Sequence, residues 1–423
     1  MKQYVIIGNG IAAAGCIEGI RSADKETPIL VISGEKHPVY CRPLISYYLQ
    51  GKTGLEKIGY RGDSFYEDNG CEVFYGVTAE AIDAAAQCVR LSDGTSVSYS
   101  KLLLATGSSP FIPPFEGLGT VRKRFSFMTL DDTLALEQAV SKTTRVLIVG
   151  AGLIGLKCAE GLKDKVAEIT VCDLAPNVLS SILDGDTAPV VQAHLEENGV
   201  RFLMGDSVKS FAGNIATMQS GKAVEFDVLV TAIGVRPNTK LLADIGGKVG
   251  RGMAVDFYMQ TSLPDIYAAG DCSEGYDASI DGPRVLALLP NAYMGGYTAG
   301  VNMAGGSRRF DKAIPMNSIG FMGLHIMTAG SYVSEQDGGT VISEKTDGGM
   351  RKFFVKDGRL QGYILMGRPM GRLTGQVLGG GIYTSLIRER TPLHTLDFEQ
   401  LVKNPTYFAF SAETRRKKFG GVV

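Results

Sequence analysis

The chain has 423 residues, of which 44% are hydrophobic and 21% charged, a composition that is ordinary for a globular protein and excludes wholesale disorder. Because 43 Lys and Arg residues nearly balance 44 Asp and Glu residues, the net charge of −1 excludes a strongly basic nucleic-acid binder. At roughly 100–200 residues per domain, the length predicts two to four domains.

The apolar segments are short throughout the sequence. The run Val5-Ile6-Ile7 is interrupted at once by glycine, whereas a secretory signal would continue toward a cleavage site. Runs such as 102–105 and 146–149 fall far below the ~18 apolar residues of a membrane span. We therefore expect a cytoplasmic protein that does not contact membranes.

The N-terminal region predicts a strand–turn–helix–strand unit. Residues 3–7 and Ile29–Ser33 are short β-branched runs, and the small-residue run Ile11–Gly19 between them suits a helix. This order of elements is typical of a βαβ unit with a parallel sheet.

The turn of this unit contains Gly8-x-Gly10-x-x-Ala13. The first Gly permits a tight turn, the second lets the backbone approach a pyrophosphate, and the small third residue packs the helix on the sheet. The helix N-terminus attracts the phosphate charge. Glu35, after the second strand, is the candidate ribose-binding acid, and a tight turn with no ligand is the alternative interpretation.

The next segment reads mostly as β-structure. Glu72–Ala85 and Cys88–Leu91 are predicted strands, and Asp93-Gly94 is a predicted hairpin turn. Residues 101–104 form a predicted buried strand, and the Ser- and Pro-rich segment Ser108–Pro114 is a predicted linker.

A second unit of the same order begins at residue 145. Arg145–Val149 and Glu168–Asp173 are predicted strands, and Leu156–Leu162 is a predicted helix between them. Two such units predict two nucleotide-binding domains. Val228–Ile233 is the predicted strand that closes the second unit.

The turn of the second unit carries the fuller fingerprint Gly150-x-Gly152-x-x-Gly155. Asp173 ends the following strand, where a carboxylate accepts hydrogen bonds from the ribose hydroxyls and repels a 2′-phosphate. The fingerprint and Asp173 therefore favour NADH over NADPH, and a solvated strand end is the alternative role for Asp173.

The character of the sequence changes from about Ile314. Val341–Ser343, Lys352–Val355 and Leu360–Met366 alternate like antiparallel strands, and Gly381–Arg390 is a predicted helix. We expect a third, α+β domain followed by a polar tail.

Seven Cys and four His residues are scattered without the spacing of metal ligands, and the sequence contains no C-x-x-C or C-x-x-x-x-C pair. This excludes a zinc ribbon, an iron–sulfur ligand set and an adjacent redox disulfide within the chain, so we expect no metal.

Four further motifs resemble one known family. Thr261…Gly270-Asp271 is similar to the second FAD motif of the two-dinucleotide-binding flavoprotein (pyridine nucleotide–disulfide) oxidoreductases, in which the Asp binds the ribityl chain. Ala105-Thr106-Gly107 resembles the crossover motif of that family, and Gly234…Asn238 resembles the motif that closes its NAD domain. Asn291 begins a segment similar to the helix beside the flavin. With both fingerprints, these motifs fall in the family's order over residues 1–310.

The resemblance implies an α/β fold with two Rossmann-like dinucleotide-binding domains, for FAD and NAD, and a C-terminal α+β interface domain. The implied FAD-binding domain is discontinuous (1–115 and 240–312), and the NAD-binding and interface domains cover 116–239 and 313–423. The implied FAD ligands are Gly8, Gly10, Ala13, Glu35, Arg42, Pro43, Ala105, Thr106, Gly107, Gly270, Asp271 and Asn291. The implied NADH ligands are Gly150, Gly152, Leu153, Ile154, Gly155, Asp173 and Gly234.

The segment 40–47 indicates a branch of this family. Its Arg42-Pro43-x-x-Ser46 core resembles the rubredoxin and ferredoxin reductase branch and the flavin domain of assimilatory nitrite reductases, which use no redox thiol. Other branches carry one active Cys in this segment, so Cys41 is the thiol expected near the flavin. A small buried apolar role for Cys41 is the alternative.

Two positions depart from the pattern of the branch. Tyr47 stands where the branch often has Lys close to flavin N5, and Lys157 stands where the family often has Glu near the nicotinamide. We hypothesise that Lys157 supplies a positive charge that favours the anionic reduced flavin. Lys157, Tyr47 and Cys41 are therefore the candidate catalytic residues, and a Lys157 that points to solvent is the alternative.

The resemblance implies an FAD-dependent NADH:acceptor oxidoreductase. Hydride would pass from NADH to flavin N5, and the electrons would leave for a small acidic protein such as rubredoxin or a ferredoxin. The basic tail Arg415-Arg416-Lys417-Lys418 would steer such a partner, with a solvated tail as the alternative.

Two other functions stay open at this point. One is an NADH oxidase, or a peroxide, persulfide or coenzyme A disulfide reductase, that uses Cys41. The other is a non-catalytic flavin-binding subunit of a larger redox complex. We expect a monomer or a homodimer.

Overall fold

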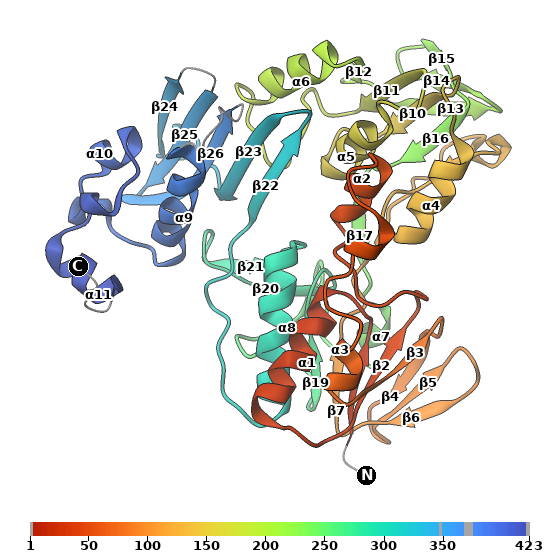
Figure 1. Ribbon diagram of the computed structural model, residues 1–423, viewed down its shortest axis with the longest axis vertical. Coiled ribbons are helices and arrows are strands. Elements are labelled where there is room, and N and C mark those ends of the chain that lie inside the picture. The colour runs from red at the N-terminus through yellow and green to blue at the C-terminus, as the bar shows by residue number, and fades with distance from the viewer. Residues whose placement is uncertain (1–2, 347–348, 368–374, 420–423) are drawn as a thin grey trace.

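The computed structural model describes residues 3–346, 349–367 and 375–419, which form three groups of elements, each built on its own sheet (Figure 1). We call these groups the N-terminal, middle and C-terminal units. Within the described residues, no helix combines the length and apolarity needed to cross a bilayer.

The N-terminal unit is built on a parallel sheet with the strand order β19-β7-β1-β2-β3. These strands are β1 (Tyr4–Ile7), β2 (Ile29–Ser33), β3 (Cys71–Tyr75), β7 (Lys101–Leu104) and β19 (Ile266–Ala268). Every residue of β1 and β2 is buried, because helices and loops cover both faces of a parallel sheet; this explains the continuous apolar runs. The predicted strands at 3–7 and Ile29–Ser33 are confirmed.

Two helices of the N-terminal unit, α1 (Ile11–Ala23) and α8 (Leu289–Met303), lie side by side in Figure 1. Their backbones meet at glycines: a Cβ on Gly296 would lie 2.0 Å from the carbonyl oxygen of Ala12, and one on Gly300 would lie 2.1 Å from that of Cys16. The small residues of both helices are therefore required by this close crossing.

The middle unit is built on a second parallel sheet, in the order β12-β11-β10-β16-β9. Its strands are β9 (Arg124–Phe125), β10 (Arg145–Val149), β11 (Glu168–Asp173), β12 (Val200–Met204) and β16 (Val228–Thr231), and its helices are α4 (Leu130–Ala139), α5 (Leu153–Leu162) and α6 (Ala188–Glu197). The helix predicted over Leu156–Leu162 begins three residues earlier, because Gly152 is its N-cap. The two parallel sheets confirm the predicted α/β class with two Rossmann-like units.

The C-terminal unit is an antiparallel sheet in the order β22-β23-β26-β25-β24. Its elements are β22 (Met316–Phe321), β23 (Leu324–Gly330), β24 (Thr340–Thr346), β25 (Gly349–Lys356), β26 (Arg359–Gly367), α9 (Gly375–Arg388), α10 (Phe398–Lys403) and α11 (Ala412–Phe419). On one face Phe353 packs with Tyr383 of α9, and on the other Phe321 and Ile326 join the core of the middle unit.

Three strands of this sheet match the predictions near 341, 352 and 360, whereas β22 and β23 were not predicted. The predicted helix Gly381–Arg390 is α9, which runs from Gly375 to Arg388. The turn between β22 and β23 has positive φ at Met322 (+48°) as well as at Gly323 (+90°), and methionine carries no sequence signal for such a turn.

Two predicted segments differ from the structure. Glu72–Ala85 is two strands, because the chain turns at Gly76 with φ +72°. The predicted linker Ser108–Pro114 contains β8 (Ser108–Pro110), which pairs antiparallel with β17 (Val235–Pro237). Proline is tolerated there because an edge strand leaves its missing N–H unpaired.

The smaller elements complete the two nucleotide-binding-like units. They are α2 (Leu44–Leu49), α3 (Phe65–Asp68), β4 (Ala79–Asp83), β5 (Cys88–Leu91), β6 (Ser96–Ser98), β13 (Val208–Ala212), β14 (Ile215–Met218), β15 (Ala223–Glu225), α7 (Lys240–Ala243), β18 (Met253–Ala254), β20 (Ser273–Asp277) and β21 (Gly282–Arg284). The predicted hairpin at Asp93-Gly94 is confirmed, since β5 and β6 pair antiparallel around it.

The α1–α8 crossing yields a stability prediction. Gly296→Ala places a methyl group on a backbone oxygen that cannot move aside, so we expect it to lower the free energy of unfolding by roughly 2–4 kcal/mol. Gly381→Ala, in α9 with no described atom within 4 Å of the new Cβ, is the matched control and should stabilise by up to ~1 kcal/mol. Calorimetric melting of both variants checks this, and equal shifts would refute the backbone contact.

Candidate cofactor-binding and redox site

The turn between β1 and α1 leaves the start of α1 open. Gly8 has φ +105°, and a Cβ there would lie 2.0 Å from the carbonyl oxygen of Ala105. Gly10 is the N-cap, and within the described chain no side chain caps it and no atom lies within 4 Å of an added Cβ. Ala13 is fully buried behind the turn. The unpaired N–H groups and the helix dipole suit a phosphate at this position.

Two connecting segments meet beside this turn. Thr106 Oγ1 donates to the carbonyl of Asn238 at 2.7 Å, and Asn238 Nδ2 donates to the carbonyl of Thr106 at 2.9 Å. Gly107 has φ +66°, with no described atom within 4 Å of an added Cβ. Asp271, three residues after the end of β19, accepts a hydrogen bond from Ser108 Oγ at 3.1 Å. Burial raises the pKa of its carboxyl group.

Glu35 belongs to a hydrogen-bonded group at the end of β2. Its carboxylate accepts hydrogen bonds from the Tyr40 hydroxyl at 2.6 Å and from Arg42 at 2.7 Å. Arg42 also donates to the carbonyl of Met128 at 2.6 Å, and Pro43 directly precedes α2. Each carboxylate oxygen has a second acceptor position, so Glu35 is able to accept a ribose hydroxyl as well.

The turn between β10 and α5 repeats the geometry of the first turn. Gly150 has φ +117°, and a Cβ there would lie 2.2 Å from the carbonyl oxygen of Ala232. Gly152 is the N-cap of α5, again without a side-chain cap from the described residues. A Cβ on Gly155 would lie 2.0 Å from the carbonyl oxygen of Gly150, so only glycine allows this helix to approach the turn.

Asp173 closes the same turn. Its carboxylate accepts hydrogen bonds from the backbone N–H of Ala151 at 2.7 Å and of Ala175 at 2.9 Å. Gly234, after β16, has φ +142° and open space beside it as far as the chain is described. Leu153 and Ile154 form the partly buried first turn of α5. This arrangement has the shape of a second dinucleotide site.

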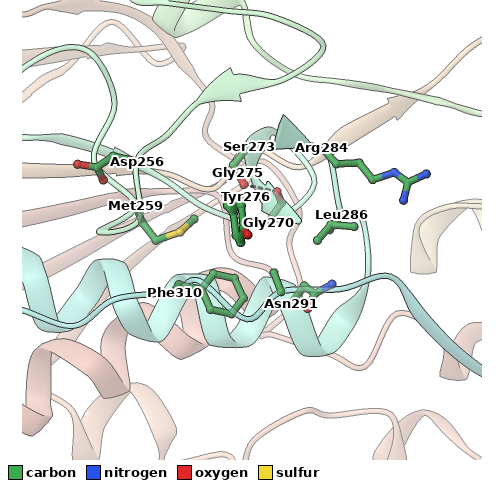
Figure 2. A pocket seen from close by; sticks show the side chains of 11 residues that line it. Asp256, Met259, Gly270, Ser273, Gly275, Tyr276, Arg284, Leu286, Asn291 and Phe310 are labelled. Carbon is green, nitrogen blue, oxygen red and sulfur yellow. Dashed lines mark hydrogen bonds between the residues drawn. The ribbon is translucent and has the colours of Figure 1, made fainter. Parts of the chain in front are cut away.

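A small cavity lies beside the start of α8. Figure 2 shows Asn291 and Phe310 on one side of it and Gly270 and Tyr276 on the other. Asn291 Nδ2 donates to the carbonyl of Ile314 at 2.9 Å, whereas its buried Oδ1 has no partner among the described residues. A buried acceptor without a donor next to Gly270 fits a ligand that brings an N–H or O–H group.

Lys157 and Tyr47 meet where the three units join. The Lys157 ammonium pairs with Glu160, donates to the carbonyl of Gly320 at 3.2 Å and lies 4.9 Å from the centre of the Tyr47 ring. Its side chain is only 17% exposed, so Lys157 does not point to solvent. Sequence analysis missed Glu160, whose only signal is its position three residues after Lys157 on a predicted helix.

Cys41 is half-buried, and burial raises the pKa of its thiol. The same cause raises the pKa of Cys16 and Cys158, which are buried on α1 and α5. All seven cysteines are free thiols. A buried thiol that favours its protonated form is a weak nucleophile at neutral pH.

The described residues give no support to a metal site or to the steering of an acidic partner by the basic tail. No cluster of three His, Cys, Asp or Glu side chains is found in the described chain. In the tail, Arg415 donates to the carbonyl of Phe410 at 2.8 Å, and the side chains of Arg416, Lys417 and Lys418 lie outside the described residues.

These turns define a class of protein: a dinucleotide-binding fold with two sites at the carboxyl ends of two parallel sheets. A family model described as pyridine nucleotide-disulphide oxidoreductase matches residues 2–296. The chain belongs to this family, as the sequence motifs indicated.

Three curated proteins show the range of its relatives. Subunit epsilon of the NADH-dependent phenylglyoxylate dehydrogenase of Aromatoleum evansii is 33% identical over 95% of both chains. An NADH oxidase of Methanocaldococcus jannaschii is 33% identical over 73% of this chain and 71% of its own. The nitric oxide reductase FlRd-NAD(+) reductase of Salmonella agona is 30% identical over 86% of this chain and 95% of its own.

Among solved structures, the covalent putidaredoxin reductase–putidaredoxin complex shares the fold, with a TM-score of 0.85, 23% identity and 95% coverage of both chains. As a member of the pyridine nucleotide-disulphide oxidoreductase family, the chain is an NADH-dependent flavoprotein oxidoreductase that binds FAD and NADH. The open helix N-termini at Gly10 and Gly152 and the unpaired Asn291 Oδ1 are consistent with two such ligands.

Asp173 yields a prediction about nucleotide choice. Because a charged acceptor to a ribose hydroxyl contributes roughly 1.5–3 kcal/mol, Asp173→Asn should weaken NADH binding about 10- to 100-fold and narrow the preference over NADPH. Asp227→Asn, which removes a carboxylate paired with Arg145 in the same unit, is the control and should leave binding unchanged. Flavin reduction rates titrated with NADH and with NADPH give the dissociation constant of each nucleotide. An equal loss of NADH affinity in Asp173→Asn and Asp227→Asn would contradict the ribose-binding role of Asp173.

Proposed function

We propose that this protein is an NADH:acceptor oxidoreductase that delivers electrons through FAD to a small redox protein of the rubredoxin or ferredoxin type. The observation that carries the proposal is the pair of open turns, one on each parallel sheet, without a protein dithiol beside them among the described cysteines. The Salmonella relative, named as an FlRd-NAD(+) reductase, supports an external protein acceptor.

In this proposal FAD lies on the N-terminal unit, and the discontinuous domain 1–115 and 240–312 corresponds to its strands. Gly8, Gly10 and Ala13 receive the pyrophosphate, and Glu35 accepts the ribose hydroxyls, held in place by Tyr40 and Arg42. Pro43, Ala105, Thr106, Gly107, Gly270, Asp271 and Asn291 surround the rest of the cofactor.

NADH lies on the middle unit, in the proposed domain 116–239. Gly150, Gly152 and Gly155 receive its pyrophosphate, Asp173 accepts its ribose hydroxyls, and Leu153, Ile154 and Gly234 line its path toward the first unit. The region 313–423 is the proposed interface domain. When bound, FAD would supply the ability to accept a hydride from NADH and to release its two electrons one at a time to two one-electron acceptors, with the proton passing to solvent.

The chain's own residues align the two nucleotides. The described cysteines are free thiols and form no disulfide that could accept the electrons. Because the electrons have no protein disulfide to reduce, an external acceptor is required. The acidic character of such an acceptor would suit the basic tail at 415–418.

A second candidate is an NADH-oxidising subunit of a larger enzyme. The Aromatoleum relative, which matches over nearly the full length of both chains, is named as one subunit of a dehydrogenase. In that case the acceptor is a redox centre on a partner subunit, and the same two nucleotide sites serve it.

The function test is anaerobic stopped-flow spectroscopy. We expect NADH to bleach the flavin of the wild-type protein, and the reduced protein to transfer electrons to rubredoxin or ferredoxin faster than to oxygen, peroxide or coenzyme A disulfide. Photoreduced protein mixed with the same acceptors is the control for the second step alone. Failure of NADH to bleach the flavin would refute the proposal, and rapid turnover with oxygen alone would favour the oxidase.

Cys41 decides whether a thiol takes part. Burial raises the pKa of the Cys41 thiol, so the protonated form is favoured at neutral pH and the thiolate forms at higher pH than in a free cysteine. Cys41→Ser should therefore change NADH-driven electron transfer by less than about twofold. Cys88→Ser, on β5, is the control, and loss of peroxide or oxygen turnover only in Cys41→Ser would establish the thiol mechanism instead.

A further inference from the structure

One ammonium group joins all three units of the molecule. Lys157 belongs to α5 of the middle unit, Tyr47 to α2 of the N-terminal unit, and Gly320 to β22 of the C-terminal unit. The Lys157 Nζ atom contacts both, at 4.9 Å from the Tyr47 ring centre and 3.2 Å from the Gly320 carbonyl oxygen. It also lies 5.6 Å from the ring centre of Phe321.

Glu160 gives this junction its second connection. Its side chain is 7% exposed, and its carboxylate both pairs with Lys157 and accepts a hydrogen bond from the backbone N–H of Met322 at 2.8 Å. His194, on α6, places Nε2 3.1 Å from the carbonyl oxygen of Phe321. The backbone groups of Phe321 and Met322 at the β22–β23 turn are therefore held by side chains of α5 and α6.

The pairing with Glu160 also limits what Lys157 is able to do electrostatically. A paired ammonium and carboxylate form a dipole, whose field falls off faster with distance than that of a single charge. The contacts that Lys157 makes are unaffected by this pairing. They join α2, which begins beside the proposed flavin site at Pro43, to α5, which begins at the proposed NADH-binding turn.

We propose that Lys157 and Glu160 are positioning residues that hold α2, α5 and the β22–β23 turn in one arrangement. They thereby align the two nucleotide sites for hydride transfer, and this inference rests on the proposed NADH-to-flavin function. Tyr47 acts as the aromatic surface on which the Lys157 ammonium rests.

The structure supplies a matched control for this role. Lys352, on β25, is 4% exposed and pairs with Asp184 and with Asp186, the latter at 2.7 Å. This second interunit ion pair, in which the lysine is buried, joins the C-terminal unit to the middle unit. Its described partners lie in the segment before α6, not on α2. Lys352→Met therefore removes an interunit ion pair and spares the Lys157–Tyr47 contact.

The experiment compares FAD-loaded wild type, Lys157→Met, Lys352→Met and the double variant Lys157→Met/Glu160→Gln. The double variant removes the pair without leaving a buried unpaired carboxylate. Hydrogen exchange of the α2 amides is measured without NADH, and the rate of flavin reduction is measured at saturating NADH. The flavin midpoint potential and the melting temperature are measured for each protein.

We expect Lys157→Met to raise exchange in α2 about tenfold and to slow NADH-driven reduction about 10- to 100-fold, with an unchanged potential. Lys352→Met should lower the melting temperature but leave α2 exchange and the reduction rate within about twofold of wild type. Lys157→Met should also lower the melting temperature, because the buried Glu160 carboxylate loses its ammonium partner. The double variant should recover that melting temperature and still be reduced slowly.

Three results from the rates and potentials would overturn the proposal. The first is equal slowing by Lys157→Met and Lys352→Met, and the second is recovery of the rate in the double variant; both indicate a general role in stability. The third is a potential shift that accounts for the slow rate, which restores the charge hypothesis. If wild type is not reduced by NADH, the proposed function fails, and unchanged α2 exchange in Lys157→Met would then refute the positioning role separately.

Discussion

Two close approaches of backbone to backbone organise this protein. A Cβ on Gly8 would lie 2.0 Å from the carbonyl oxygen of Ala105, and one on Gly150 would lie 2.2 Å from that of Ala232. In both units the chain therefore leaves a central strand through a turn that only glycine tolerates and enters a helix whose first N–H groups have no described side-chain cap. The two open turns lie at the carboxyl ends of parallel strands, where ligands of open α/β sheets bind.

The third unit contacts both of the other two. One face of its sheet joins the core of the middle unit, and its α9 end reaches the N-terminal unit through Arg390, which pairs with Asp281 at 3.0 Å. The C-terminal unit therefore bridges both nucleotide-binding units instead of attaching to one alone. Contacts of this kind restrain the relative rotation that the domains of one chain otherwise have.

The parts of the fold that sequence predicts are those with a local steric cause. The strands Ile29–Ser33 and Arg145–Val149 match residue for residue, and the fingerprint glycines stand at the turns that require them. The parts it misses depend on contacts between distant segments. Gly320 lies 163 residues from Lys157, and the sequence around it carries no motif. That the charge of Lys157 favours the anionic reduced flavin remains a prediction. The alternative, a Lys157 side chain that points to solvent, is wrong because Glu160 and Tyr47 enclose the ammonium group.

A buried ion pair at the centre of such a bridge is a poor source of stability. Removing two charges from water costs several kcal/mol per ion, and well-packed apolar residues often replace such pairs without loss. Lys157 and Glu160 instead make directional hydrogen bonds. The buried ammonium needs an acceptor and the buried carboxylate needs a donor, so few arrangements of α2, α5 and the β22–β23 turn satisfy both. Apolar packing alone would tolerate small rotations among these elements, and hydride transfer loses rate steeply with such displacements. The polar junction is therefore better explained by the demand for one geometry than by the free energy of folding.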